Sequence, residues 1–305
     1  MKRSIVIEQS TSLRLSSGLL EFETDAGVKR VPIEDLSIIV LDQAAIQVTE
    51  KVLAKLSSSG VVLIVCDEKH LPCGYLFPYQ AHGLMPDILR KQVQVSLPTK
   101  KRLWQQIVQE KIMSQARFLQ ERFDYDFGLI RMASSVRSGD VDNREGAAAA
   151  VYFPALFGSS FVRMRGPRVE LYDTDPSREL LVNAMLNYGY AILRAMVARC
   201  LAATGLHPTF GIQHRHRENA FALVDDLLEP LRVLVDRMVY FLLPRVCDDT
   251  MYLTPMIKRE LLQILRCEIS FQKERWTLDS ALEGYCSSFR SCLFGESRKL
   301  LLPSV

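Results

Sequence analysis

The apolar residues of this chain change their spacing once along its length. As far as about Tyr79 they fall in short alternating or β-branched segments, separated by turn signals such as Ser16-Ser17-Gly18, a pattern typical of strands. From Lys100 onward they recur every three or four residues, the spacing of one helix face. With 305 residues, the chain is long enough for two domains. The sequence predicts an α+β protein, with a small β-sandwich-like domain over residues 1–79, a linker over 80–98 and a larger all-helical domain over 99–305.

Individual elements follow from the same patterns. Thr49 is a good N-cap for a helix that ends before Gly60. The continuous apolar run Val61–Cys66 suits a strand buried on both faces. We expect a small antiparallel sheet with strands at 4–7, 12–15, 19–24, 29–32 and 37–41. We expect helices from Lys100 and at 145–157, 176–203, 221–243, 254–270 and 281–301, with Asp175 as the N-cap of the second of these five ranges.

Composition and apolar runs limit where the protein works. Hydrophobic residues make up 48% and charged residues 24%, as in soluble folded proteins. No apolar run reaches the ~20 residues that a membrane-spanning helix needs, and the apolar start is too short for a signal peptide. The seven cysteines contain no Cys-x-x-Cys pair, which favours free thiols in a reducing compartment. We therefore expect a cytoplasmic protein with no membrane partner.

Positive charge is concentrated in one stretch. The net charge of +3 is too small to indicate a nucleic-acid partner. Between Arg90 and Arg117, however, seven basic residues stand against one acid, Glu110. On the predicted helix from Lys100 they would lie opposite the apolar face of Trp104, Ile107, Val108, Ile112, Ala116 and Leu119. The stretch is either a cationic track for phosphates or an ordinary solvated helix face.

The first segment with chemical potential is Asp142-Asn143-Arg144-Glu145-Gly146, which runs into four alanines. Asp142 and Glu145 have the spacing of a capping box, and in that interpretation they only satisfy free backbone donors at a helix start. The small residues after Glu145 would instead let a second helix approach closely. Glu145 would then lie at a crowded helix contact rather than in solvent.

The second segment is the run from Gly211 to Arg217, in which His214 and His216 alternate with arginines. A His-x-His pair can bind zinc, but the companion ligands at suitable spacing are absent. One histidine acting with carboxylates would instead suit Mn²⁺ or Mg²⁺. The alternative is a surface loop whose histidines have no special role.

The third segment is Asp225-Asp226-Leu227-Leu228-Glu229-Pro230-Leu231-Arg232. A helix places Asp226 and Glu229 on one face, and Pro230 predicts a kink where these acids lie. The alternative is a surface row of acids in which Arg232 pairs with Glu229.

Five motifs in this order resemble those of the CRISPR-associated integrase of spacer acquisition, a metal-dependent endonuclease, and the strand-rich start is similar to that family's N-terminal domain. The Asp-Leu-x-Glu-Pro wording is similar to members that accompany the single large RNA-guided effector nuclease, the type II kind. The motifs are Asn143-Arg144-Glu145-Gly146, Asn183-x-x-Leu186-Asn187-Tyr188-Gly189-Tyr190, Gly205-Leu206-His207-Pro208, Gly211-x-x-His214 and Asp226-Leu227-Leu228-Glu229-Pro230-Leu231-Arg232.

The resemblance implies a site. The family's metal ligands fall on Glu145, His214 and Glu229, which would hold Mg²⁺ or Mn²⁺, and Asp226 would be an auxiliary acid. Many relatives have Asp where Glu229 stands. His216 matches no motif residue, and Tyr172 could approach the scissile phosphate. The basic residues expected at DNA are Lys100, Lys101, Arg102, Arg163, Arg165, Arg215 and Arg217.

The resemblance also implies an activity and partners. The helical domain would be catalytic and would insert protospacer DNA into a CRISPR repeat by attack of a 3′-hydroxyl on a phosphodiester. The chain would form a homodimer through its strand-rich domain, with a small ferredoxin-like CRISPR adaptation protein as partner and the large effector nuclease as a further one. Two alternatives remain open: a stand-alone metal-dependent nuclease of branched DNA in repair or defence, and a non-enzymatic DNA-binding scaffold.

Overall fold

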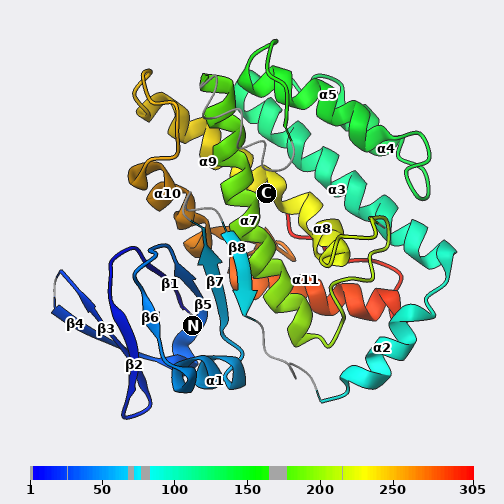
Figure 1. The fold of residues 1–305 in the computed structure, drawn as a ribbon. Coiled ribbons are helices and arrows are strands. Elements are labelled where there is room, and N and C mark those ends of the chain that lie inside the picture. The colour runs from blue at the N-terminus through cyan, green and yellow to red at the C-terminus, as the bar shows by residue number, and fades with distance from the viewer. Residues whose placement is uncertain (1–2, 26, 68–71, 77–82, 165–176, 215) are drawn as a thin grey trace.

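The computed structural model describes residues 3–25, 27–67, 72–76, 83–164, 177–214 and 216–305. Strands lie at the N-terminal end and helices make up most of the rest (Figure 1). The α+β class predicted from the change of spacing is confirmed. The division at 79 and 98 stays a prediction; the range 80–98 contains helix α2 (Met85–Val93) and the start of α3 (Leu97–Phe123).

The strand-rich region contains two sheets. The first has the order β1 (Arg3–Ile7), β5 (Leu36–Leu41), β7 (Val62–Cys66) and β8 (Pro72–Leu76), and the second has the order β4 (Gly27–Pro32), β3 (Leu19–Thr24), β2 (Ser12–Ser16) and β6 (Gln47–Val48). Strands β1, β5 and β7 are parallel, and so are β2 and β6. The expectation of one antiparallel sheet is confirmed for β2, β3 and β4, which pair antiparallel, but it was wrong for the strands expected at 4–7 and 37–41, which pair in parallel as β1 and β5. Parallel neighbours need long crossover connections, and here strands β2–β4 connect β1 to β5 while α1 (Glu50–Ser58) precedes β7.

Strands β5 and β7 are buried on both faces. Ile39 and Leu63 pack with the second sheet and α1, while Ile38 and Ile64 pack with the helices. The double burial predicted for Val61–Cys66 is thus confirmed for its first part, since Val61, Val62, Leu63 and Ile64 are at most 3% exposed. One sheet therefore serves two cores, and the short helix α1 is capped by Thr49 as expected.

The rest of the described chain is mainly helical. After α3 come α4 (Leu129–Ser134), α5 (Arg144–Phe157), α7 (Arg178–Ala203), α8 (Ala222–Leu228), α9 (Arg232–Leu242), α10 (Pro255–Leu261) and α11 (Leu278–Leu293), with 3₁₀ turns at Ile33–Asp35, Glu229–Leu231, Leu243–Arg245 and Leu262–Arg266. Ser177, not Asp175, caps α7 through the backbone N–H of Leu180; Asp175 and Pro176 lie outside the described residues.

Two predicted helices were wrong at their C-terminal ends. The segment 254–270 leaves helical conformation after Arg266 and enters the hairpin β9 (Glu268–Phe271) and β10 (Glu274–Thr277), and α11 ends at Leu293 instead of 301. The second region is therefore not wholly helical. The hairpin turn places Gln272 and Lys273 at positive φ, a conformation that usually carries Gly or Asn, so the sequence held no ordinary turn signal there.

Helix α7 runs through the middle of the helical region (Figure 1). By length and composition, α7 could cross a membrane, although the sequence analysis identified no such segment. However, 83% of its most apolar window is buried inside the protein. Such burial is typical of a helix in the core of a folded protein. The seven cysteines are all free, as expected.

Candidate functional site

Helix α3 contributes a lysine, Lys111, to the site. Its predicted apolar face is buried, from Trp104 through Ile107 and Ile112 to Leu119. Lys111 lies in the same stripe and is only 5% exposed. Its assignment to an exposed cationic face was therefore wrong. The ammonium group points into the protein, where its Nζ lies 2.6 Å from Oε1 of Glu145 and 2.5 Å from Oε2 of Glu229.

Glu145 reaches this position because of how α5 begins. Asn143 has a positive φ of 51° and caps the helix by accepting from the N–H of Gly146. Asp140 accepts from the N–H groups of Arg144 and Glu145. Asp142 instead forms an exposed ion pair with Arg137, so the predicted capping box is wrong. With the backbone donors satisfied by other residues, the Glu145 carboxylate is available for α3, and the crowded helix contact expected for it is observed.

Glu229 lies where α8 gives way to α9. Pro230 has no N–H to donate to the carbonyl of Asp226, and the chain forms the 3₁₀ turn Glu229–Leu231 before α9 begins. The predicted break is confirmed. The Glu229 side chain is 4% exposed, and its Oε2 lies 3.0 Å from Nε of Arg232. Burial alone would raise the pKa of Glu229, but the charges of Arg232 and Lys111 outweigh it and lower the pKa to about 2.

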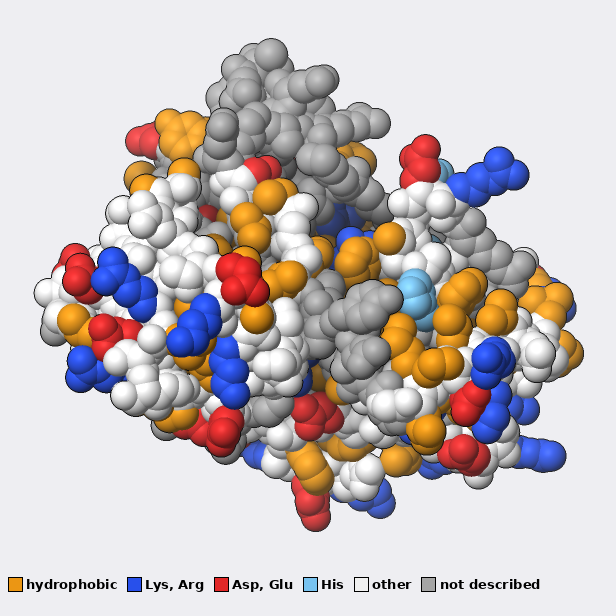
Figure 2. All heavy atoms as spheres, turned by 60° about the horizontal axis from the view of Figure 1, so that its bottom comes forward, with side chains coloured by type: hydrophobic (Ala, Val, Ile, Leu, Met, Phe, Trp, Pro, Cys, Tyr) orange, Lys and Arg blue, Asp and Glu red, His pale blue; other side chains and the backbone are white. Residues whose placement is uncertain are grey.

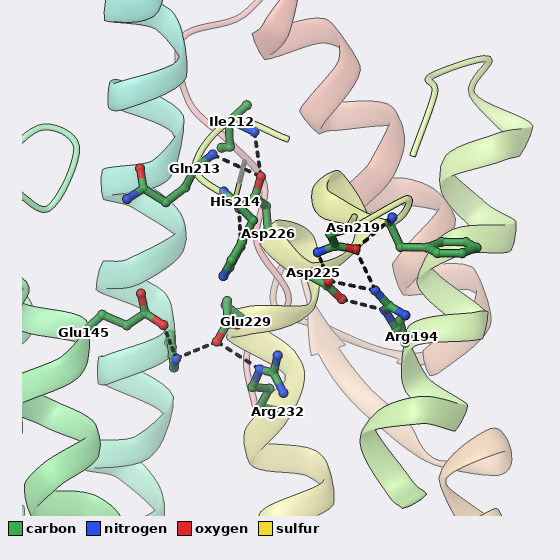
Figure 3. A network of polar contacts seen from close by, with 12 residues as sticks. Glu145, Arg194, Ile212, Gln213, His214, Asn219, Asp225, Asp226, Glu229 and Arg232 are labelled. Carbon is green, nitrogen blue, oxygen red and sulfur yellow. Dashed lines mark hydrogen bonds and ion pairs between the residues drawn. The ribbon is translucent and has the colours of Figure 1, made fainter. Parts of the chain in front are cut away.

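Asp226 anchors the loop that carries His214. Its carboxylate accepts from the backbone N–H groups of Ile212, Gln213 and His214, at 2.6, 3.2 and 3.1 Å, and lies 2.7 Å from His214 Nδ1 (Figure 3). Asp226 is fully buried. Burial raises the pKa of its carboxyl, and the hydrogen bond that the His214 ring donates to Asp226 raises the pKa of His214. Asp226 therefore positions the histidine and its loop, with both carboxylate oxygens engaged.

Two of the three residues expected to bind metal, Glu145 and Glu229, come from separate elements and meet at Lys111. Figure 3 shows the carboxylates of Glu145 and Glu229 pointing toward each other and His214 lying beside Glu229. After the hydrogen bond to Asp226, the charges of Glu229 and Glu145 also raise the pKa of His214. In the described part of the chain, no three acidic, histidine or cysteine side chains already form a metal-ligand cluster. Lys111 lies between the carboxylates, and Asp226 binds Nδ1 of the histidine.

This arrangement fits a divalent cation. Two carboxylate oxygens already converge on a single positively charged atom, at distances close to the ~2.0–2.6 Å of oxygen ligands to Mg²⁺ or Ca²⁺. Because Asp226 holds His214 through Nδ1, Nε2 is the ring nitrogen left for coordination, and such a carboxylate–histidine pair is a common support of metal ligands. The assignment of Glu145, His214 and Glu229 as ligands stays a prediction.

The basic residues expected at DNA occupy different environments. Lys101 and Arg217 are exposed, and Lys100 and Arg102 are half-buried. Arg163 is half-buried and donates to Asn183 and Asn187. Arg165, Tyr172 and Arg215 lie outside the described residues, and His216 is exposed. On the face seen in Figure 2, basic and acidic side chains are interspersed rather than separated by sign. The role of these residues at DNA stays a prediction.

Sequence reasoning missed the buried partners of the acids. Arg232 was weighed only as a surface partner of Glu229, although Glu229 is buried and the Arg232 side chain is only 25% exposed. Asp236 accepts hydrogen bonds from Tyr152 and Tyr190, and the ring of Tyr190 lies under the guanidinium groups of Arg163 and Arg232. The available signal was spacing, since Asp236 follows Arg232 by one helical turn.

Comparison with known proteins agrees with the motifs. The family described as CRISPR associated protein Cas1 matches residues 4–249. The CRISPR-associated endonuclease Cas1 of Neisseria meningitidis serogroup C (strain 8013) is 38% identical over 309 residues, covering 99% of this chain and 96% of that protein.

Two solved structures share the fold. A casposase bound to integration product has a TM-score of 0.77 and 17% identity, covering 98% of this chain and 92% of that one. A chain of a Cas6-RT-Cas1–Cas2 complex has a TM-score of 0.76 and 18% identity, covering 99% of this chain and 36% of that one. The family match and the Neisseria relative both extend over most of the chain, and this protein belongs to the CRISPR-associated Cas1 family.

Proposed function

We propose that this chain is a divalent-metal-dependent DNA integrase and endonuclease of CRISPR spacer acquisition. The observation that carries the proposal is the convergence of Glu145 and Glu229 on one cationic atom, beside a histidine fixed by Asp226. A bound Mg²⁺ or Mn²⁺ would polarise a phosphoryl oxygen and stabilise charge on the attacking and leaving oxygens. Glu145, Glu229 and His214 would hold it.

The reaction requires little covalent chemistry from the protein. A 3′-hydroxyl oxygen of the incoming DNA forms a new bond to phosphorus while the bond from phosphorus to the adjacent sugar oxygen breaks. The attacking hydroxyl loses its proton and the leaving oxygen gains one. The chain's own residues orient the reactants and match the charge. If water attacks in place of the hydroxyl, the same site cuts DNA, so both activities follow from one geometry.

The partners are proposed on the same basis. Similar chains are a casposase bound to integration product and a member of a complex with Cas2, which supports double-stranded DNA and a small CRISPR adaptation protein as partners of this chain. A homodimer through the strand-rich region, contact with the large effector nuclease and a cytoplasmic location stay predictions.

Strand joining tests the proposal. The purified chain and its adaptation partner would be incubated with a 3′-hydroxyl DNA, a repeat-bearing plasmid and Mg²⁺ or Mn²⁺. Glu145→Gln and Glu229→Gln should each lower joining by at least about 100-fold, since even outer-sphere partners of metal ligands are worth 10–100-fold, while DNA binding is retained. Glu218→Gln, which alters an exposed acid in the loop after His214, is the matched control. Full joining by both site variants, or joining that survives EDTA, would contradict the proposal.

A further inference from the structure

Lys111 is a buried cation placed between the two acids that the proposed function assigns to a metal. Its side chain is 6% exposed, and its Nζ contacts Glu145 on α5 and Glu229 in the 3₁₀ turn. The two carboxylate oxygens meet at this nitrogen, which is also where a shared divalent ion would have to lie. An ion can therefore occupy the position between the carboxylates only if the ammonium group moves away.

The positive and negative side chains around the Lys111 ammonium group already balance one another. Arg232 pairs with Glu229 through its Nε, so two cations face the two carboxylates. Asp226 has its oxygens engaged by His214 and three backbone N–H groups. A divalent ion entering alone would add two positive charges to a buried, balanced group. It would also leave the ammonium group buried without its partners, which is strongly unfavourable.

A DNA phosphate removes both difficulties. It brings negative charge, and its oxygens accept hydrogen bonds from an ammonium group. Lysine has a flexible four-carbon stem and three donors that can turn toward a new acceptor. Resting on the proposed function, we propose that Lys111 couples the binding of the divalent ion to the binding of DNA: the ion replaces the ammonium group between Glu145 and Glu229 when a DNA phosphate accepts that group. Each ligand then raises the affinity for the other by the same factor.

Titration calorimetry of Mn²⁺ binding to the full chain, with and without a short DNA duplex, tests this proposal. The heat of Mn²⁺ binding to the duplex alone is subtracted. Wild type should bind Mn²⁺ at least about tenfold more tightly with DNA than without it, which is about 1.4 kcal/mol of coupling. Lys111→Met removes the charge and keeps an unbranched side chain. It should bind Mn²⁺ alone at least about tenfold more tightly than wild type, and DNA should change that affinity less than twofold.

Lys258→Met is the matched control, because Lys258 is also buried, at 3% exposure. It lies in α10, and the acids that interact with its charge include Asp42 and Glu8 but not the acids of the site. It should keep the wild-type coupling. If Lys111→Met unfolds without metal, the negative charge that Lys111 no longer balances predicts that Mn²⁺ restores a cooperative melting transition and that Na⁺ at equal ionic strength does not. The coupling measured on wild type is independent of that variant.

The outcomes separate this proposal from the proposed function. If Glu229→Gln abolishes Mn²⁺ binding while Lys111→Met binds no more tightly than wild type, the metal site stands and the role of Lys111 is refuted. Equal Mn²⁺ affinity of wild type with and without DNA refutes it too. If Glu229→Gln leaves Mn²⁺ binding unchanged, both proposals fall.

Discussion

Asp236 is a carboxyl group enclosed by helices, and it makes folding stability sensitive to pH. Burial raises its pKa from 3.8 to about 6, although Tyr190 and Tyr152 donate hydrogen bonds to it. The folded protein therefore holds this proton more tightly than the unfolded chain does. The resulting stabilisation is present below pH ~4, is lost as pH rises to ~6, and amounts to about 2–3 kcal/mol.

Asp236→Asn should remove this dependence, because the amide oxygen still accepts from the tyrosines but does not ionise. Urea unfolding of both proteins at pH 4.5 and pH 7.5 measures the effect. The free energy of unfolding of the variant, relative to wild type, should increase by about 2 kcal/mol between the two pH values. Other acids affect both proteins alike, so an unchanged difference between variant and wild type would contradict the prediction.

Sequence motifs name the residues of the candidate site, but they do not name the partners that its acids have in the structure. Glu145, His214, Asp226 and Glu229 lie in ordered motifs that name them directly. Lys111 was counted with exposed bases, although it follows Ile107 by four residues and Val108 by three, which places it in the apolar stripe of α3. A lysine in such a stripe must find negative partners from other elements. Those partners come from distant segments, and local spacing cannot identify them.

At the scale of elements, the loop from Gly211 to His214 depends on a close approach of backbone to side chain. A Cβ at Gly211 would lie 2.4 Å from the carbonyl oxygen of His214 and 2.9 Å from Oδ2 of Asp226. Gly211→Ala must therefore displace the loop from the carboxylate that holds His214. We expect a loss of about 1–3 kcal/mol in the free energy of unfolding, as for other overpacked sites, and a fall in strand joining larger than that stability loss explains.

Gly83→Ala is the control, since a Cβ there meets no atom of the described residues within 4 Å. Thermal unfolding gives the stability change, and joining assays well below the melting temperature give the activity. Wild-type joining by Gly211→Ala would show that His214 does not depend on the loop geometry.

Element prediction succeeded where one residue dictates the backbone. Pro230 predicted the break before α9, and Thr49 predicted the start of α1. It failed at two positions of positive φ that the spacing of apolar residues does not indicate. Asn143 at positive φ moved the cap of α5 away from Asp142, and Lys273 at positive φ allowed the β9–β10 hairpin. Asn is a common residue in this conformation, but Lys is not, so Lys273 gave no signal of the turn.

At the scale of the whole molecule, the proposed DNA path can be tested through its charge. Lys101 is exposed at the start of α3, and Lys100 and Arg102 flank it. Replacing all three by Ala should weaken DNA binding and reduce the slope of log affinity against log salt by up to about 3, while Mn²⁺ binding and the melting temperature stay unchanged. Binding titrations at several salt concentrations provide the slope.

The control removes the same charge elsewhere, at Arg266, Lys273 and Arg275, which are exposed at or beside the β9–β10 hairpin. Undiminished affinity of the α3 variant at low ionic strength, where the electrostatic contribution is largest, would make this stretch an ordinary solvated face. The path would then have to be sought among other bases, such as Arg163 and Arg217.

The overall class was predictable because the two periodicities differ, and the run Val61–Cys66 already indicated a doubly buried strand. Sheet topology was not predictable, since strand order depends on which segments pair across long connections. The expected antiparallel pairing holds for β2, β3 and β4. It failed for β1, β5 and β7, which pair in parallel although β2–β4 lie between the first two in sequence.

The double burial of β5 and β7 limits how this protein can vary. Ile39 and Leu63 belong to one core, whereas Ile38 and Ile64, their neighbours along the strands, belong to the other. A change of side-chain volume on either strand is thus constrained by two sets of neighbours through one backbone. A chimera that took its strand-rich region from a relative would need the matching helix surface as well, so the two regions are expected to change together rather than as exchangeable modules.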